Sequence, residues 1–300
     1  MRIRRIVPAL LASALAVATF GMLTGAGVAS ASAAGRGPSV CAGTLKSPGA
    51  LTGTHRSVVV RGVCFVNAGR ARVLGNLSVA PRGVLLAAFA LNDRTHKGRS
   101  SLTVGGSLTV GAGGTLLLGC EAAHFACLDD PHQKHPTLSS RSSVSGNLFA
   151  AGALGVVVHA ATIGGSVLQT GGGGGRTCTP SGIFAQFKSP VYSDYEDSSI
   201  GAGLLVANLR SCWFGAPRNH VSGNVLVAGN KLADPDAMEV VSNHVRRNLA
   251  CFGNSPAVQF GDSHGTPNLV RGTAAGQCGF GVRKPTPAPN GPLQHISLRA

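Results

Sequence analysis

A short pattern recurs along the chain: an apolar residue, a Gly-Asn or Gly-Ser pair, and a second apolar residue. Clear copies occupy residues 73–79, 104–110, 144–148, 163–167 and 221–227, and a degenerate copy occupies 245–249. A unit repeated every few tens of residues is typical of solenoids. Because Gly and Asn tolerate left-handed backbone angles, each copy predicts a corner between two strands.

Apolar runs around these corners are short and end at Gly, Asn, Ser or Pro. They occupy residues 58–60, 73–79, 102–118, 148–158, 163–168, 200–206, 221–227 and 238–241. Runs of this length and composition are typical of strands, and few segments have the composition of an amphipathic helix. The pattern therefore predicts an all-β protein.

The spacing of the corners distinguishes between all-β folds. Gly146 and Gly165 are 19 residues apart, Gly223 and Arg247 are 24 apart, and Gly75 and Gly106 are 31 apart. These intervals fit coils of about 20 to 25 residues with occasional insertions. A sandwich would need hairpin turns every 8 to 12 residues, and that pattern is weak here. We therefore predict a single-stranded right-handed parallel β-helix with loop insertions.

Asparagines at equivalent positions of stacked coils can hydrogen-bond along the solenoid. One predicted column contains Asn76, Asn147, Asn224 and Asn248, and a second contains Asn230 and Asn254.

The chain divides into four predicted regions. Residues 1–33 have the basic start, apolar stretch and small-residue cleavage sites of a signal peptide, so we expect a secreted protein, extracellular or loosely associated with the cell wall. Residues 34–57 form an N-terminal segment or cap. The β-helix covers 58–281, with insertions near 121–142 and 171–199, and a flexible Pro-rich tail covers 282–300. No other stretch could span a bilayer, so no transmembrane anchor is expected.

The even number of cysteines favours disulfides in a secreted protein. They are Cys41, Cys64, Cys120, Cys127, Cys178, Cys212, Cys251 and Cys278. Spacing alone does not fix the pairing, but coils contact only their neighbours, so we expect each cysteine to pair with the next one in this list. The alternative is a zinc site made of Cys120, Cys127 and nearby histidines such as His124.

The chain is strongly basic, with a formal net charge of +15. Between Arg36 and Arg99, ten Arg and Lys residues accompany one acid, Asp93. An anionic polysaccharide or cell-wall polymer is therefore a possible partner. The alternative is a soluble cationic protein whose charge has no specific partner. Nucleic-acid binding is not expected, because aromatic residues are few and no recognition helix accompanies the charge.

The corner pattern is densest at residues 221–225 and 243–256, and it ends at 268–272 and 276–278. In these stretches the chain resembles secreted right-handed parallel β-helix proteins of high-GC Gram-positive bacteria. The resemblance implies the architecture only, because that group has no settled function.

Two acidic groups lie in predicted turns. The first contains Asp194, Glu196 and Asp197, and the second contains Asp234, Asp236 and Glu239. Neither has the full ligand count or the fixed glycine of a known calcium loop, and we expect both to be solvated turns. If they meet in the fold, they supply the carboxylate pair of a glycosidase. Asp129-Asp130 predicts an exposed turn. The sequence around Ser263 resembles the motif around a serine-protease nucleophile, but the repeats that surround it do not resemble a protease fold.

Two functions remain. The first is a non-catalytic structural or binding β-helix, for which the sequence assigns no catalytic, cofactor-binding or metal-ligating residue. The alternative is a polysaccharide lyase or glycoside hydrolase, which would use the acidic groups with a basic partner such as Arg218. Oligomeric state is not predicted, although open β-helix ends could self-assemble.

Overall fold

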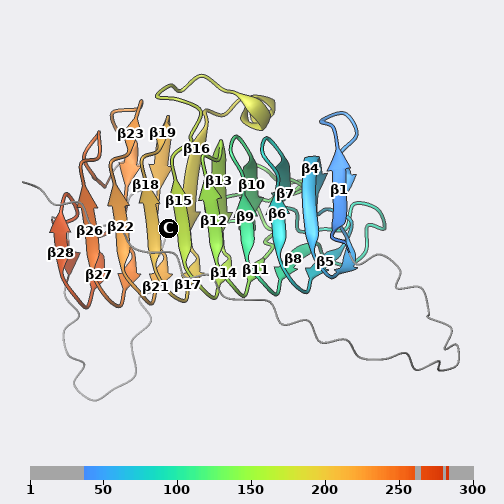
Figure 1. The fold of residues 1–300 in the computed structure, drawn as a ribbon, viewed down its shortest axis with the longest axis horizontal. Helices are drawn as coiled ribbons and strands as arrows, with labels where there is room; N and C mark the ends of the chain where they lie inside the picture. Colours follow the sequence, from blue (N-terminus) through green and yellow to red (C-terminus); the bar gives the residue numbers. More distant parts are fainter. Residues whose placement is uncertain (1–36, 261–264, 280–281, 284–300) are drawn as a thin grey trace, which may run out of the picture. The chain divides into compact units, whose positions relative to one another are not determined.

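The computed structural model describes residues 37–260, 265–279 and 282–283. They form the predicted parallel β-helix, with strands stacked side by side in chain order (Figure 1). The predicted signal peptide, Ser263 and nearly all of the predicted tail lie outside the described residues. No helix within the described ranges is long and apolar enough to cross a membrane.

Three sheets run along the β-helix, and we call them A, B and C. Sheets A and B are joined through β4, which contributes its first half to A and its second half to B. Sheet A contains β1 (Ser39–Gly43), β4 (Val58–Phe65), β6 (Leu77–Val79), β9 (Leu108–Val110), β12 (Leu148–Ala151), β15 (Val167–Thr170), β18 (Leu204–Ala207), β22 (Val225–Ala228), β26 (Leu249–Phe252) and β28 (Ala274–Gly276).

Sheet B contains β2 (Gly49–Ala50), β4, β7 (Val84–Ala87), β10 (Thr115–Leu118), β13 (Gly155–His159), β16 (Tyr192–Glu196), β20 (Trp213–Gly215) and β24 (Met238–Glu239). Sheet C contains β3 (Gly53–His55), β5 (Arg70–Val73), β8 (Ser101–Val104), β11 (Ser143–Val144), β14 (Thr162–Ile163), β17 (Ser199–Ile200), β21 (His220–Val221), β25 (His244–Val245), β27 (Asn268–Val270) and β29 (Val282–Arg283). β19 (Arg210–Ser211) pairs with β23 (Lys231–Leu232), and η1 (Gly182–Phe187) is a short 3₁₀ helix.

The recurring sequence pattern is the corner between sheets C and A. In one coil, Val144 ends a strand of sheet C and Leu148 begins a strand of sheet A, and both side chains are buried in the core. The same two positions are apolar in the neighbouring coils, in register. One inward side chain on each side of the corner therefore builds a continuous core along the β-helix.

Close approach between coils, rather than backbone angle, explains the corner glycines. None of the repeated Gly positions at 75, 106, 146, 165 and 223 has a positive φ, so the expected left-handed geometry is wrong there. A Cβ on Gly146 would lie 2.8 Å from the carbonyl oxygen of Gly106 in the preceding coil. A side chain at this position would push the stacked corners apart.

Both predicted asparagine columns are present. In the first, each side chain accepts a hydrogen bond from a backbone N–H of the next coil, as Asn76 Oδ1 does from Ser107 at 2.8 Å. The second is a buried ladder in which Asn230 Nδ2 donates to Asn254 Oδ1 at 2.9 Å. A third ladder, also buried and not predicted from the sequence, is formed by Asn219, Asn243 and Asn268.

All four predicted disulfides are confirmed. They are Cys41–Cys64, Cys120–Cys127, Cys178–Cys212 and Cys251–Cys278. The zinc alternative is therefore wrong, because Cys120 and Cys127 are bonded to each other and offer no thiolate.

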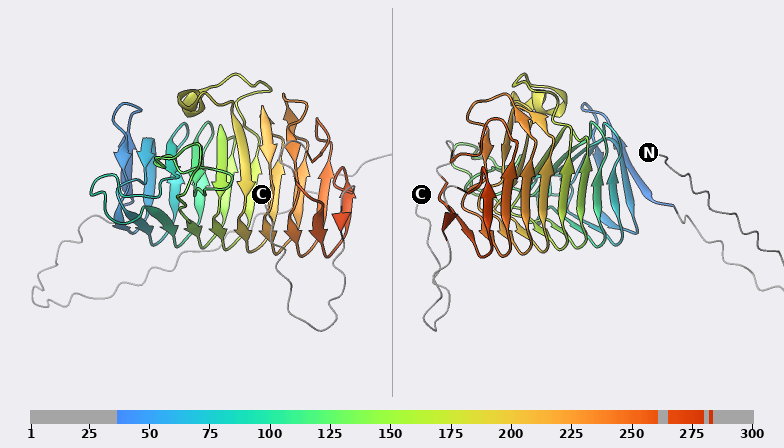
Figure 2. Two further views of the ribbon diagram at one scale, coloured as in Figure 1. Left: turned by 180° about the vertical axis from the view of Figure 1, so that it is seen from behind. Right: turned by 60° about the vertical axis from the view of Figure 1, so that its left-hand side comes forward.

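Two insertions lie against the outer face of sheet B. The loop after β10 is seen in green over the strands in the view from behind (Figure 2), and its Leu128 N–H donates to the carbonyl of Ala88. The insertion that carries η1 begins after β15 and projects past the strand ends (Figure 1). The sequence predicts an insertion up to about residue 199, but the structure already forms β16 at Tyr192–Glu196.

Candidate functional site

The outward positions of sheet B change character along the β-helix. One outward position, in register on successive strands of sheet B, is occupied by Leu86, Leu117, Val157, Asp194, Gly215 and Glu239. We call this set the outward column. The apolar half is covered by the two insertions and forms a second, smaller core. Asp194 and Glu239 continue the same column and are also buried, at 4% and 0% exposure. Burying carboxylates is costly, so this change from Leu and Val to acids is the first sign of a site.

His159 lies at the centre of the cluster, at the end of β13. Its Nε2 is 3.3 Å from Asp194 Oδ2, and its Nδ1 is 3.1 Å from Glu196 Oε2. Phe125, from the loop after β10, stacks on the imidazole with ring centroids 4.3 Å apart. Only 2% of His159 is exposed. A histidine enclosed between two carboxylates is placed to exchange protons.

Arg218 joins two acids at the next corner of the coil. Its Nη2 contacts Glu196 Oε1, and its Nε lies 3.0 Å from each carboxylate oxygen of Asp197. Asp197 and Arg218 both adopt positive φ, at 49° and 56°. Such angles are unfavourable for residues other than Gly and are concentrated at functional sites.

Neighbouring charges shift the pKa values around this pair. Burial first, and then the hydrogen bond and charge of Glu121, raise the pKa of Asp197 well above its ordinary value, against the opposing charge of Arg218. Burial, followed by the charge of Arg218, lowers the pKa of His124.

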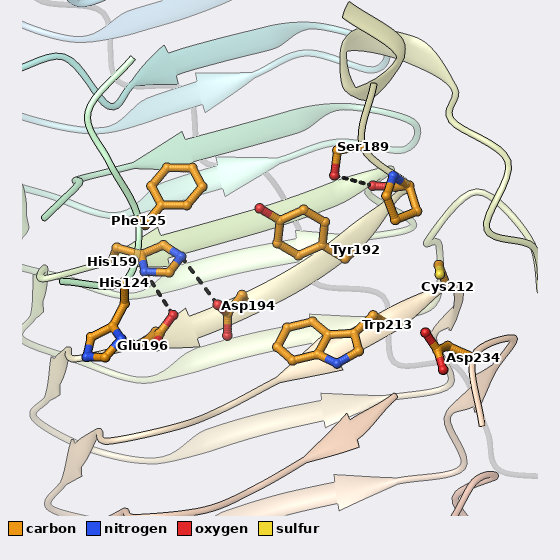
Figure 3. Close-up of a pocket in the computed structure, with 11 residues that line it drawn as sticks. His124, Phe125, His159, Ser189, Tyr192, Asp194, Glu196, Cys212, Trp213 and Asp234 are labelled. Atoms are coloured by element: carbon orange, nitrogen blue, oxygen red, sulfur yellow. Dashed lines mark hydrogen bonds and ion pairs between the residues drawn. The ribbon is translucent and has the colours of Figure 1, made fainter. Parts of the chain in front are cut away.

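An open pocket of about 400 Å³ lies over this cluster (Figure 3). Tyr192 and Trp213 occupy paired positions on β16 and β20, and their rings meet edge to face at 6.0 Å. Gly215 leaves room for the Trp213 ring, because a Cβ there would overlap that ring and lie 2.6 Å from Asp194 Oδ1. The volume and the mixture of aromatic and polar walls suit a small ligand or one or two sugar units.

Disulfides hold both covering segments next to the pocket. Cys120–Cys127 closes a tight loop that places His124 and Phe125 in the pocket wall. On the other side, Cys212 lines the pocket and is bonded to Cys178 in the insertion that carries η1.

The structure brings together most of the predicted acidic residues. Asp194 and Glu196 line the pocket from β16, with Asp197 and Arg218 beside them, so the prediction of a solvated turn is wrong. From the second group, Asp234 lines the pocket and Glu239 is buried on β24, whereas Asp236 is exposed.

Other candidates have structural roles. Asp129 accepts hydrogen bonds from the backbone of Ala90 and Leu91, and Asp130 accepts three from its own loop. Asp130 is buried, so the predicted exposed turn is wrong for this residue.

The sequence analysis did not identify His159, Glu121 or Phe125 as site residues. His159 directly follows the apolar run 155–158. A polar residue at the end of a buried strand is the only local feature of the sequence that could have indicated a site residue here.

A metal centre is not assigned to this cluster. Three groups have ligand atoms within 4.8 Å of one another: Cys178/Cys212/Asp234, His124/Glu196/Asp197 and His159/Asp194/Glu196. The first contains a disulfide. In the other two, the Glu196 oxygens already face Arg218 and His159. A guanidinium in contact with the central carboxylate repels a cation.

Fold and site together define a disulfide-linked parallel β-helix with a carboxylate–histidine–arginine cluster on one outer face. Comparison with protein-family models, with curated proteins and with solved structures finds no significant match.

Proposed function

We propose that this protein is a secreted glycoside hydrolase that acts on a polysaccharide at the outer face of sheet B. The observation that carries the proposal is the Asp194–His159–Glu196 cluster in the floor of an open pocket. One oxygen of each carboxylate lies within 4.8 Å of the other. Glycosidases work with a carboxylate pair, and enzymes that retain the anomeric configuration hold the two carboxyl groups about 5 to 5.5 Å apart.

The contacts suggest how the roles are divided. Asp194 lines the pocket and its Oδ1 has no hydrogen-bond partner among the described residues, and we assign to it the attack on the anomeric carbon. Glu196, the second carboxyl group of the pair, lines the pocket; it gives a proton to the glycosidic oxygen and then accepts one from water. His159 and Arg218 hold Glu196 in place through contacts with its two carboxylate oxygens.

A purely structural role explains the cluster less well. Replacing a buried ion pair by apolar residues is often neutral or stabilising, and the same column is apolar in the preceding coils. A lyase is also less favoured than a hydrolase, because lyases of this kind act on acidic sugars and the pocket already carries an excess of carboxylates.

The test is incubation of the purified protein with a panel of polysaccharides, with release of reducing ends and ultraviolet absorbance of unsaturated sugars measured in the same samples. Asp194→Asn should lower turnover at least about 100-fold. Asp236→Asn is the matched control, since Asp236 is exposed and does not line the pocket. Equal turnover of both variants, or no released product from any glycan, contradicts the proposal.

A second function is supported by a different observation. The first coils expose a series of arginines and one acid, and an anionic cell-wall polymer could bind there without being cleaved. These arginines are Arg56, Arg61, Arg70, Arg72 and Arg82. Co-sedimentation with acidic wall fractions that is lost at high salt, and is insensitive to Asp194→Asn, supports this function.

A further inference from the structure

The acids of this chain are concentrated at one place. The chain has 11 acidic residues against 26 Lys and Arg. Six of those acids belong to the site: Glu121, Asp194, Glu196, Asp197, Asp234 and Glu239. Arg218 is the one Arg or Lys in ion-pair contact with them among the described residues, joined by His124 and His159 when these are protonated. A basic protein therefore carries an acidic pocket.

Internal contacts neutralise only part of this charge. Arg218 pairs with Glu196 and Asp197. Asp194 and Asp234 remain in the pocket wall without an arginine or lysine partner. Asp194 Oδ1 has no hydrogen-bond partner in the described structure, and its residue is 96% buried.

The two acids flank an aromatic surface. Trp213 lies between Asp194 and Asp234 in the pocket, with Tyr192 beside it (Figure 3). Carboxylates next to aromatic faces bind organic ammonium groups, through charge-assisted hydrogen bonds and cation–π attraction. A metal ion would need several converging oxygens, whereas an ammonium group needs one or two acceptors.

We propose that the pocket recognises a glycan with protonated primary amines, such as a polymer of 2-amino sugars whose amino groups are not acetylated. This inference rests on the proposed hydrolase function for its identification of a sugar. Its own basis is the charge and aromatic lining of the pocket. In the bound state, one sugar ring lies against Trp213 and its ammonium group bonds to Asp234.

The experiment measures binding by calorimetry at mildly acidic pH with three oligosaccharides of equal length: glucosamine oligomers, their N-acetylated counterparts and oligogalacturonate. We expect glucosamine oligomers to bind at least about tenfold more tightly than the N-acetylated ones and oligogalacturonate to bind least. Asp234→Asn should weaken the binding of glucosamine oligomers up to about fivefold, as for a partly exposed ion pair, and leave the N-acetylated oligomers unaffected. Asp236→Asn is the control.

The outcomes separate this inference from the proposed function. Equal affinity for amine and N-acetyl oligomers, or a preference for oligogalacturonate, overturns amine recognition. A preference for glucosamine oligomers that Asp234→Asn does not reduce also overturns it, because the charge would then act elsewhere. Release of reducing ends from any of the three supports the hydrolase whichever oligomer binds best. Amine-selective binding without release supports recognition and contradicts hydrolysis.

Discussion

Gly215 lies between Asp194 and Glu239 in the outward column of sheet B, and its missing side chain shapes the pocket. Gly215→Ala should displace the Trp213 ring, because the new Cβ would overlap it. Trp213 is the only tryptophan in the chain, so intrinsic fluorescence reports its position directly. We expect a shift in emission and weaker glycan binding. Gly37→Ala is the control, since a Cβ there meets nothing within 4 Å. An unchanged spectrum for Gly215→Ala contradicts this account of the pocket.

The proposed role of Asp194 also predicts the anomeric configuration of the product. If its free oxygen attacks the anomeric carbon, two successive displacements take place and the product retains the anomeric configuration. Nuclear magnetic resonance of the first product formed distinguishes retention from inversion. An inverted product would mean that Asp194 activates water instead of attacking the sugar.

Among the elements, the buried ladder of Asn219, Asn243 and Asn268 links three coils after sheet B. Asn243 is its centre, donating to the Ala216 carbonyl and to Asn268 while accepting from Asn219. Asn243→Ala leaves buried partners unsatisfied and should lower the free energy of unfolding by about 2 to 3 kcal/mol. Asn224→Ala, at an exposed corner with one such bond, should cost less than about 1 kcal/mol. Denaturant unfolding measures both, and equal losses would contradict the importance of burial.

His220 and His244 are paired neighbours on β21 and β25, with ring centroids 4.7 Å apart. Burial, and then the charge of His220, lower the pKa of His244. The unfolded chain therefore binds a proton at this residue at higher pH than the folded one does. Stability should fall as the pH decreases through the ordinary histidine range, and His220→Asn should reduce that loss. Thermal melting from about pH 7.5 to about pH 5.5 tests this, with exposed His96→Gln as control.

Most of the predicted apolar runs are strands of the structure, but β16, whose inward residues are polar, was not predicted. The corner pattern identified β11 and β12 because Val144 and Leu148 alternate with polar residues. β16 gave no such signal. Its inward residues are Ser193 and Tyr195, which are satisfied by Gln169 through bonds of 2.9 and 2.8 Å.

The site was only partly predictable for a related reason. Asp194, Glu196 and Asp197 are adjacent in sequence, and their grouping could be read directly. His159 and Glu121 come from earlier coils, and stacking brings them to the same face. Which residues share an outer face depends on insertion lengths, and these cannot be read from a repeat whose coils vary in length.

At the scale of the molecule, the β-helix and its site depend on different bonds. The core runs through every coil, whereas His124 and Phe125 line the pocket from the loop closed by Cys120–Cys127. Replacing both cysteines by alanine should therefore reduce turnover or glycan affinity by at least about tenfold, while stability falls by only about 2 to 3 kcal/mol. Activity and melting are measured on the same preparation. Loss of the whole fold would contradict this separation of roles.

The four disulfides join cysteines only 23, 7, 34 and 27 residues apart. Each disulfide therefore joins two cysteines of the same or neighbouring coils. During the proposed secretion, each pair can therefore oxidise as soon as the coil that carries it has left the translocation pore. We expect this order of synthesis to protect the molecule from mispaired cysteines, since each thiol meets its own partner before later thiols are exposed.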